Sequence, residues 1–485
     1  MDLIESLLKA RPYRSSELAE KIVEVEKIKP DAARKRLSRA RSPVKRLKIN
    51  LPNKEKIFYL EGQLGSTLFA DTVTNILIET NSAAGRALIG LKTVGGALPL
   101  SLFPKTSGTS ALHSKKHLYF QKVLDQLSEI NLIHINKEAV SGDLVCLHGH
   151  ADITKKQDAI FTVENIALSI VKTWLSNLGI SSPNAIKIRE EGPTYGTFAW
   201  DIVGPSYLSG LVTFKKGQIQ NAFVVGDIIL NKKITIEILA PFFYKLSSLK
   251  NQQKIRPFIT IIIAESFEEE ALIELRKKGV IIAMPKTILG KENAALLRAL
   301  IEAIEKADEV IRNNPEKFLE LLKKINKIEG AALNLRSVVF DFIIARLYSL
   351  EGYQCEIRKK IITKKNRDRA EIDVLAERVE RIVCIEGKAM APKNIVTKAE
   401  IEDWIERVCP RVKQWLKERE RTPATKILEF YSSTDYDQEA LTLINEIKIN
   451  HKKIKINFFN GKEIIEKLRA LNQNSLISIY KEQFM

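Results

Sequence analysis

The sequence predicts a multidomain chain in which α+β domains precede α/β domains. With 485 residues, of which 45% are hydrophobic, the chain is long enough for about three or four packed domains. In its first third, short helical patterns alternate with single pairs of strands, whereas the later apolar strands are separated by longer helices. One order of elements also occurs twice, about 170 residues apart. We therefore expect two small N-terminal domains, then two larger α/β domains joined by a helical connector.

The charge balance narrows the class of partner. Lysine and arginine outnumber acidic residues by 77 to 59, which gives a formal net charge of +18. This excess favours a polyanionic partner, with nucleic acid ahead of a membrane surface. No apolar run reaches about eighteen residues, so we expect no membrane-spanning helix. The start of the chain lacks the basic segment of a signal peptide, and the four widely spaced cysteines are mostly typical of free apolar side chains. These features favour a cytoplasmic protein.

Residues 1–61 carry three helical patterns followed by a pair of strands. The helices are expected at 2–10, 15–25 and 29–41. Ser15 is expected to cap the second helix and Pro30 to begin the third. The strands surround a polar turn at 53–56. This order resembles the winged helix-turn-helix domain, and the resemblance implies a basic third helix that enters the major groove of DNA.

Basic residues on and after the third helix are the expected DNA contacts. Arg34 and Arg39 are expected to reach the bases, with Lys35 beside them. Lys45 and Arg46 are expected to contact phosphates. The alternative is a solvated basic helix in a winged helix that binds protein.

Residues 62–152 resemble a second, less basic winged helix. Its helices and strands are expected at 69–80, 83–98, 116–136 and 143–149. The spacings of His113 with His117 and of Cys146 with His148 would allow zinc ligation. Because no paired CxxC spacing accompanies them, we favour ordinary polar loop histidines.

A β-hairpin over residues 371–388 carries the residues with the clearest chemistry. Its strands are expected around 372–375 and 382–385, with a charged turn at 377–381. Residues two apart on a strand face the same side, so Glu386 and Lys388 point together, and strand pairing could bring Asp373 beside them. Two carboxylates and an ammonium group at the end of a sheet would form a metal site with a charged helper. Hard oxygen ligands favour Mg²⁺.

An Asp on one strand and Glu-x-Lys on the next resemble the PD-(D/E)XK, or restriction-endonuclease-like, nuclease superfamily. The resemblance covers roughly residues 330–470. It also implies an upstream helix with an acid, and residues 336–351 supply one with Asp341. A helix at 396–420 and a strand at 426–433 follow, as the family requires. Ala370-Glu371 stand before Ile372-Asp373 where the family often has a proline.

The resemblance implies a role for each residue of the hairpin. Asp373 and Glu386 would hold one or two Mg²⁺ ions, for which Mn²⁺ could substitute, and Asp341 would add a direct or water-mediated contact. Lys388 would orient the attacking water or offset charge on the phosphate. A basic stretch from Lys359 to Arg369 precedes Asp373 and would follow the DNA backbone, or form a solvated loop. The alternative for the whole set is surface charge on an amphipathic hairpin.

Residues 153–290 repeat this pattern in a form without the Glu-x-Lys motif. A helix at 160–180 carries Glu164, and a following strand carries Asp201. In this copy we place Gly226 and Ile228 at the motif positions, and we expect Asp227 to point away because strand neighbours face opposite sides. We therefore expect an inactive copy used for packing, dimerisation or DNA holding. The alternative is an unrelated α/β domain with the same order of elements.

Taken together, the expected architecture is a pair of tandem winged helices followed by two restriction-endonuclease-like α/β domains joined by a helical connector. The expected boundaries are 1–61, 62–152, 153–290, 291–329 and 330–485, in which the connector consists of two helices broken at 313–315 and the last 14 residues have no assigned structure.

The expected function is a metal-dependent DNA endonuclease of restriction or genome-defence type. Duplex DNA is the expected substrate, and a homodimer would cut both strands. The alternatives are a non-catalytic winged-helix regulator, or a nuclease that acts on branched DNA or RNA.

Overall fold

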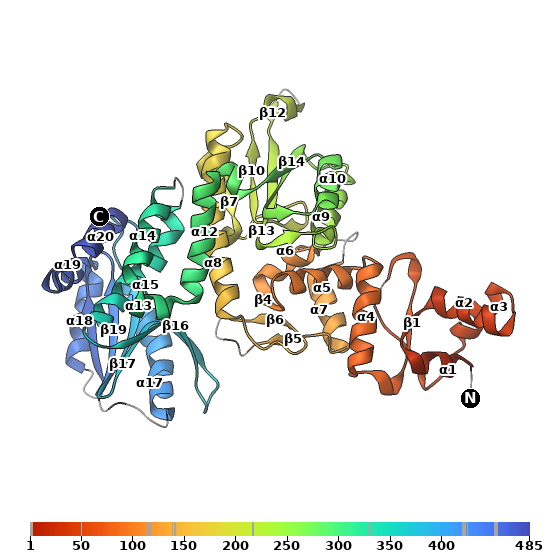
Figure 1. Cartoon of the computed structure of the whole chain (residues 1–485), viewed down its shortest axis with the longest axis horizontal. Helices are drawn as coiled ribbons and strands as arrows, with labels where there is room; N and C mark the ends of the chain where they lie inside the picture. The colour runs from red at the N-terminus through yellow and green to blue at the C-terminus, as the bar shows by residue number, and fades with distance from the viewer. Residues whose placement is uncertain are drawn as a thin grey trace. The chain divides into compact units, whose positions relative to one another are not determined.

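A computed structural model shows a mixed α/β chain with several small, separate sheets (Figure 1). It describes residues 3–49, 51–113, 118–137, 139, 142–215, 218–328, 331–419, 423, 425–450 and 454–485. Contacts divide the chain into two compact units. The first unit comprises residues 1–137, 143–153 and 184–282, and the second comprises 138–142, 154–183 and 283–485.

The first unit begins with helices packed on a three-stranded sheet. Its elements are α1 (Leu3–Ala10), β1 (Tyr13–Arg14), α2 (Ser15–Glu26), α3 (Pro30–Ser38), β2 (Val44–Arg46), η1 (Pro52–Lys54), β3 (Ile57–Leu60) and η2 (Glu61–Gln63). The antiparallel sheet has the order β1-β3-β2. Buried side chains from all three helices and from β3 form its core.

Two local expectations for this region were wrong. The third helix ends at Ser38, so Arg39 is its C-terminal cap and lies outside the helix. Arg14, not Ser15, occupies the N-cap of α2. Ser15 is the first helical residue, and its backbone and hydroxyl bond to Lys56, which ties α2 to the loop before β3.

A second group of helices with a three-stranded sheet follows in the first unit. Its elements are α4 (Thr67–Glu79), α5 (Ala83–Thr93), β4 (Ala97–Pro99), η3 (Leu100–Leu102), α6 (Phe103–Ser107), α7 (Phe120–Glu129), β5 (Ile133–Asn136) and β6 (Leu144–Leu147). Its sheet has the order β4-β6-β5 and is antiparallel. Ser66 and Ser82 cap α4 and α5 through their side chains, as expected for helices that begin after serine.

A five-stranded sheet completes the first unit. Its strands are β7 (Lys187–Ile188), β10 (Ile202–Ser206), β13 (Ala222–Ile234), β14 (Phe258–Phe267) and β15 (Val280–Ala283), in that spatial order. Helix α9 (Ala240–Lys250) lies between β13 and β14 in the chain, and α10 (Glu269–Lys277) between β14 and β15. The smaller elements are η4 (Pro183–Ala185), η5 (Arg189–Glu191), β8 (Thr194–Tyr195), β9 (Phe198–Ala199), η6 (Ser209–Leu211), β11 (Thr213–Lys215) and β12 (Gln218–Gln220).

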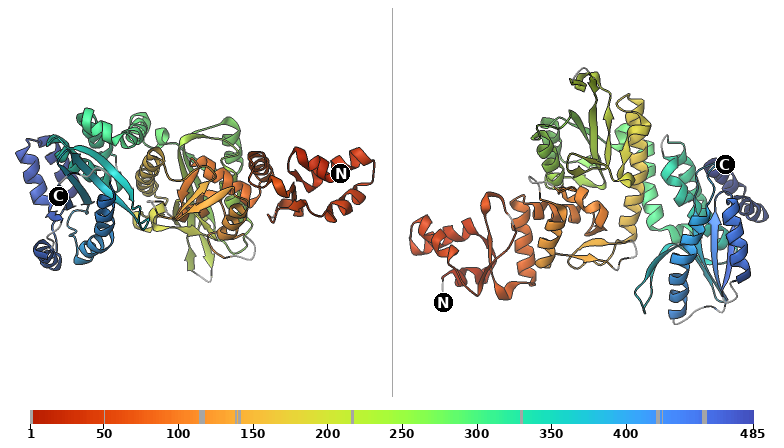
Figure 2. Two further views of the ribbon diagram at one scale, coloured as in Figure 1. Left: turned by 90° about the horizontal axis from the view of Figure 1, so that it is seen from below. Right: turned by 180° about the vertical axis from the view of Figure 1, so that it is seen from behind.

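The second unit is built on another five-stranded sheet, β16-β17-β18-β19-β20. The strands are β16 (Gln354–Ile362), β17 (Arg369–Arg378), β18 (Arg381–Lys388), β19 (Thr425–Ser432) and β20 (Lys455–Phe459). Helices cover both faces (Figure 2). On one face α15 (Ala332–Leu350) contacts β16, β17 and β18. On the other face an apolar cluster joins the sheet to α16 (Lys398–Asp403), α17 (Cys409–Glu418) and α18 (Gln438–Asn450).

Further helices complete the second unit. They are α8 (Lys155–Asn177), α11 (Pro285–Ile288), α12 (Gly290–Glu305), α13 (Ala307–Asn313), α14 (Pro315–Asn326), α19 (Gly461–Ala470) and α20 (Asn474–Phe484). The connector breaks at Asn314, as expected, and also at Lys306. The single helix expected at 396–420 is interrupted by a π-helical turn, η7 (Trp404–Val408). Pro410 explains the interruption, because it has no N–H and its ring crowds the preceding turn.

The two five-stranded sheets share one topology. In both, the strands lie side by side in chain order. In both, the first two pairings are antiparallel and the third is parallel. Each sheet is also preceded in the chain by a long helix, α8 for the first and α15 for the second. The internal repeat expected from the sequence is therefore present as a repeat of sheet topology.

No helix in the described ranges has the length and apolar character needed to cross a membrane. All four cysteines are buried free thiols.

Candidate active site

Strands β17 and β18 form the hairpin expected from the sequence, with a tighter turn. They pair from Val374 opposite Ile385 to Arg378 opposite Arg381, so only residues 379 and 380 form the turn. Asp373 directly precedes the first of these pairs and Glu386 directly follows it. The hairpin register therefore brings these two acids side by side at the end of the ladder.

Gly387 connects the hairpin to the acid on α15. Its N–H donates a 2.7 Å hydrogen bond to Oδ2 of Asp373. A Cβ atom on Gly387 would lie 3.3 Å from Oδ1 of Asp341 and 3.3 Å from the ring of Phe340. The missing side chain thus lets α15 approach closely, and buried Asp341 lies on that side of β18. Glu386 faces the other way, towards η7 and α17, as strand neighbours do.

Burial raises the pKa of all three acids, and the charge of Asp373 adds to this effect at Asp341 and Glu386. Burial raises the pKa of Asp341 well above its ordinary value, and the charge of Asp373 raises it further. The pKa of Glu386 is raised in the same way, by burial and then by Asp373. Burial also raises the pKa of Asp373, although the Gly387 N–H, Arg358 and Lys388 oppose that effect. The cluster Asp341, Asp373 and Glu386 is therefore short of positive charge.

Lys388 lies at the solvent edge of this cluster. Its ammonium is 3.3 Å from Oε1 of Glu400, the residue that closes the capping box of α16, and 42% of its side chain is exposed. Its charge lowers the pKa of both Glu386 and Asp373, so it lies within electrostatic reach of both. Glu400 holds it in place without burying it.

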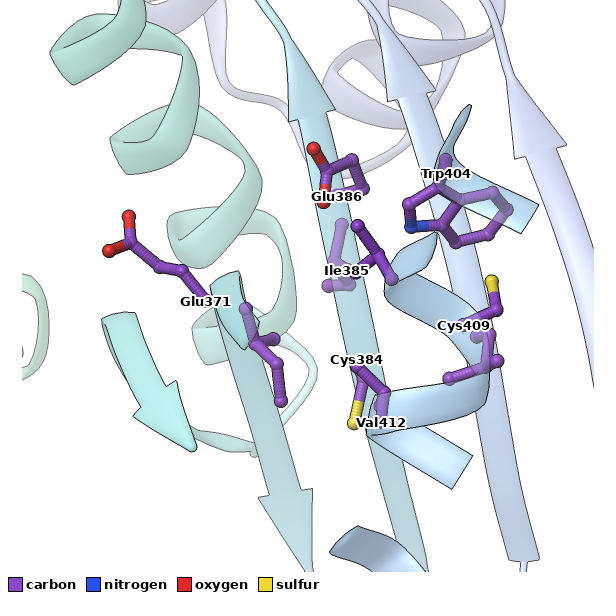
Figure 3. A pocket seen from close by; sticks show the side chains of 10 residues that line it. Glu371, Cys384, Ile385, Glu386, Trp404, Cys409 and Val412 are labelled. Atoms are coloured by element: carbon purple, nitrogen blue, oxygen red, sulfur yellow. The ribbon is translucent and has the colours of Figure 1, made fainter. Parts of the chain in front are cut away.

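A small hollow adjoins Glu386 on the side of α17 (Figure 3). Its volume is about 10 Å³, enough for about one water molecule, and Trp404, Cys384 and Cys409 form part of its wall. In Figure 3 the carboxylate of Glu371 extends away from this wall. Burial raises the pKa of the Cys409 thiol to about 12, so it stays protonated and is a poor nucleophile.

Two of the three acids, and not all three, are arranged to hold a magnesium ion. In the part of the chain that the structure describes, no group of three or more His, Cys, Asp or Glu side chains is arranged to hold a metal ion. This follows from the geometry, because Asp341 and Glu386 lie on opposite sides of β18. Mg²⁺, however, is commonly held by one or two carboxylates with waters and substrate phosphates. Asp373 and Glu386 provide such a pair.

The five-stranded sheet of the first unit holds a pair of acids in the same arrangement, but with more positive charge around them. Asp201 Oδ2 accepts a 2.9 Å hydrogen bond from Ile228 N–H, as Asp373 accepts one from Gly387. Ile202 pairs with Gly226, so Asp201 and Asp227 flank that pair. Asp227 therefore corresponds to Glu386. This differs from the expectation that Gly226 and Ile228 occupy the motif positions and that Asp227 points away.

Cations fill the cluster of the first unit. Lys105 Nζ and Arg189 Nε lie 2.8 and 2.7 Å from the carboxylate of Asp201, which is fully buried. Burial would raise the pKa of Asp201, but these two cations lower it overall. Lys245 from α9, with 0% exposure, donates to Asp227 Oδ2 at 2.5 Å. Burial raises the pKa of Asp227 and lowers that of Lys245. The third acid expected in this copy, Glu164, is buried on α8 among residues of the second unit.

The basic residues expected to contact DNA remain at the surface of the first unit. Arg34, Lys35, Arg39 and Arg46 are exposed and Lys45 is half-buried. Arg34 makes a 3.5 Å ion pair with Asp31, and Lys45 makes one of 3.4 Å with Glu61. Arg46 also lines a hollow of about 130 Å³ with Tyr59 and Gln126. Of the suggested zinc ligands, His117 lies outside the described residues.

Sequence reasoning missed the cations that lie beside the acids of both clusters. Arg358, on β16, lies 3.5 Å from Asp341, and Lys245, Arg189 and Lys105 surround the acids of the first unit. One signal could have pointed to two of them, because the dipeptide Ile-Arg at 188–189 and at 357–358 stands before the aspartate strand in both copies of the repeat. Lys105 and Lys245 come from helices whose approach only the fold defines.

Comparison with protein families, curated proteins and solved structures finds nothing that matches this chain.

Proposed function

We propose that the chain is a Mg²⁺-dependent nuclease that hydrolyses phosphodiester bonds in DNA at the end of the β17–β18 hairpin. The single observation that carries this proposal is the pair Asp373 and Glu386 at the end of the hairpin ladder, in which the pKa of each acid is raised. Carboxylates held together without enough positive charge favour a divalent cation. The contrast with the first unit supports this, since Lys105, Arg189 and Lys245 already neutralise the corresponding acids there.

Each residue of the hairpin has a distinct task in this proposal. Asp373 and Glu386 would hold the cation, while the Gly387 N–H fixes the orientation of the Asp373 carboxylate. Bound Mg²⁺ would supply the Lewis-acid chemistry of hydrolysis, which offsets phosphate charge and lowers the pKa of a water. Lys388, which is partly exposed and anchored by Glu400, would orient that water or contact the phosphate. Asp341 would act from the α15 side, directly or through water.

DNA is the favoured substrate because of charge and of the N-terminal elements. The formal net charge is +18, and the order α1-β1-α2-α3-β2-β3 supports a winged helix with α3 as its DNA-reading helix. Exposed Arg34 and Lys35 on α3 and Arg39 just after it would contact the DNA. The architecture we infer is thus tandem winged helices and two nuclease-like domains, in an enzyme of restriction or genome-defence type.

Two variants of the full chain test the assignment. Glu386→Ala and Lys388→Ala should each lower Mg²⁺-dependent cleavage of plasmid DNA at least 100-fold, because a metal ligand or the charged helper is lost. DNA retention in a mobility-shift assay should be unchanged, because neither residue lies on the proposed reading helix. Lys398→Ala is the matched control, since its ammonium pairs with Glu402 on the same helix as Glu400.

The same digest separates the competing functions. Cleavage at the parental rate by either hairpin variant would remove these residues from the site. Binding without any cleavage by the parent chain in Mg²⁺ or Mn²⁺ would favour a non-catalytic regulator. Faster cleavage of branched DNA or RNA than of duplex DNA would change the substrate class.

A further inference from the structure

Arg189 and Arg358 occupy the same position in the two repeats. In the first sheet Ile188 pairs with Ile202, and in the second Ile357 pairs with Val374. Arg189 directly follows Ile188 in the chain, and Asp201 directly precedes Ile202. In the second sheet, Arg358 likewise follows Ile357, and Asp373 precedes Val374. Both copies therefore place an arginine across from the aspartate of the acidic pair.

The two arginines nevertheless bind different partners. Arg189 bonds directly to Asp201, with 2.7 Å between Nε and Oδ1. Arg358 extends instead to the carboxylate on α15, with 3.5 Å between Nε and Oδ2 of Asp341. Its Nη1 is 3.2 Å from Oγ1 of Thr162 and 3.9 Å from Oδ2 of Asp158, both on α8. In the second copy the guanidinium is thus held by two helices.

The backbone at Arg358 accounts for this difference in direction. Arg358 has a φ of +52° inside β16, while Ile357 and Lys359 on either side keep their pairing with β17. A left-handed residue other than glycine persists within a strand only when its surroundings hold it there. The contacts to Asp341, Thr162 and Asp158 provide that hold.

We propose that Arg358 is a positioning residue that leaves Asp373 available for a divalent cation, and that Asp158 and Thr162 of α8 keep it turned away. The inference rests on the proposed metal site. In the first repeat the equivalent arginine occupies its aspartate, and Lys245 occupies the second acid. In the second repeat the turned arginine leaves the pair Asp373 and Glu386 open. Helix α8 precedes the first sheet in the chain, so a helix of the first repeat serves the site of the second.

Mn²⁺ binding to the full-length chain tests this idea without measuring activity. The dissociation constant is taken from the electron paramagnetic resonance signal of free Mn²⁺. The double variant Asp158→Asn/Thr162→Val should bind Mn²⁺ at least tenfold more weakly, because the released guanidinium can then reach Asp373. Arg358→Met should bind Mn²⁺ at least as tightly as the parent, because a competing cation is gone.

A double-mutant cycle separates positioning from a general loss of charge or structure. In the Arg358→Met background, the two changes on α8 should no longer weaken Mn²⁺ binding. Lys359→Met, in the next residue of β16, is the matched control and should leave the affinity unchanged, because its ammonium pairs with Glu356.

The possible results have distinct meanings. An unchanged affinity in the α8 double variant would overturn the role of Arg358. The same tenfold loss in the Arg358→Met background would overturn it too. If the parent chain binds no Mn²⁺ while circular dichroism shows it folded, the proposed metal site itself fails.

Discussion

At Gly387 there is little room for a side chain between the hairpin and α15. An added Cβ would lie 3.3 Å from Asp341 Oδ1, 3.3 Å from Phe340 and 3.4 Å from Ile344, all on a buried helix face. We expect Gly387→Ala to lower the free energy of unfolding by about 1–2 kcal/mol, the usual cost of overpacking. Urea denaturation measures this change. Gly62→Ala is the control, because that position has open space around it. Equal losses in both variants would contradict the close approach.

Asp201 should make the free energy of unfolding of the first unit depend on pH in the acidic range. Its folded pKa is lowered by Arg189 and Lys105 against the effect of burial, so its stabilisation is present above the unfolded pKa near 4 and is lost as pH falls further. Asp201→Asn should cost about 3–5 kcal/mol at pH 7, because two buried cations lose their partner. The difference from the parent should shrink below about pH 4. Thermal unfolding across this pH range tests both statements, and a difference that is independent of pH would contradict them.

At the scale of elements, the C-terminal helix α20 secures the helix that carries Asp341. Phe484 is 2% exposed and its ring lies 5.4 Å from that of Phe340, while Tyr480 donates a 2.6 Å hydrogen bond to Ser433 O. We expect Phe484→Ala to destabilise the second unit by about 3–5 kcal/mol, because it leaves a cavity beneath α15. Chemical denaturation measures this. Met485→Ala is the control and should change the free energy of unfolding little, because Met485 is 73% exposed. A similar loss in that variant would show that the effect of Phe484→Ala does not come from core packing.

The elements also show what the sequence could predict. The hairpin could be predicted from its two apolar strands and charged turn. Helix α15 is buried on nearly all sides, so it was predicted from a continuous apolar stretch and from the order of elements that the nuclease resemblance implies. The tail helix was missed although Leu476, Ile479, Tyr480 and Phe484 have helical spacing, since no strong cap marks its start. The correspondence of Asp227 with Glu386 depends on strand register, and the position of Lys245 depends on the approach of α9. Neither is encoded in the local sequence, so only the fold could provide them.

At the scale of the whole molecule, the two repeats differ in the charge left at their acidic pairs. The acids of the first repeat are bonded to Arg189, Lys105 and Lys245, whereas Asp373 and Glu386 have no comparable buried partners among the contacts found for the described residues. Under the proposed nuclease function, each chain would therefore contribute one cutting site. A single site of this kind would cleave one strand of a duplex, so a break in both strands would require two chains or two successive events.

The kinetics of plasmid cleavage test this count of sites. With Mg²⁺ and dilute protein, nicked circles should accumulate before linear DNA, at a rate proportional to protein concentration. If two chains assemble on the DNA, the rate of linear product should rise with about the square of concentration in the dilute range. Mixing the parent with an excess of Glu386→Ala should then suppress linear product more strongly than nicked product, because mixed dimers cut one strand. Linear DNA that forms without a nicked precursor, from protein that sedimentation shows to be monomeric at the same concentration, would mean two active sites in one chain and would return cutting activity to the first repeat.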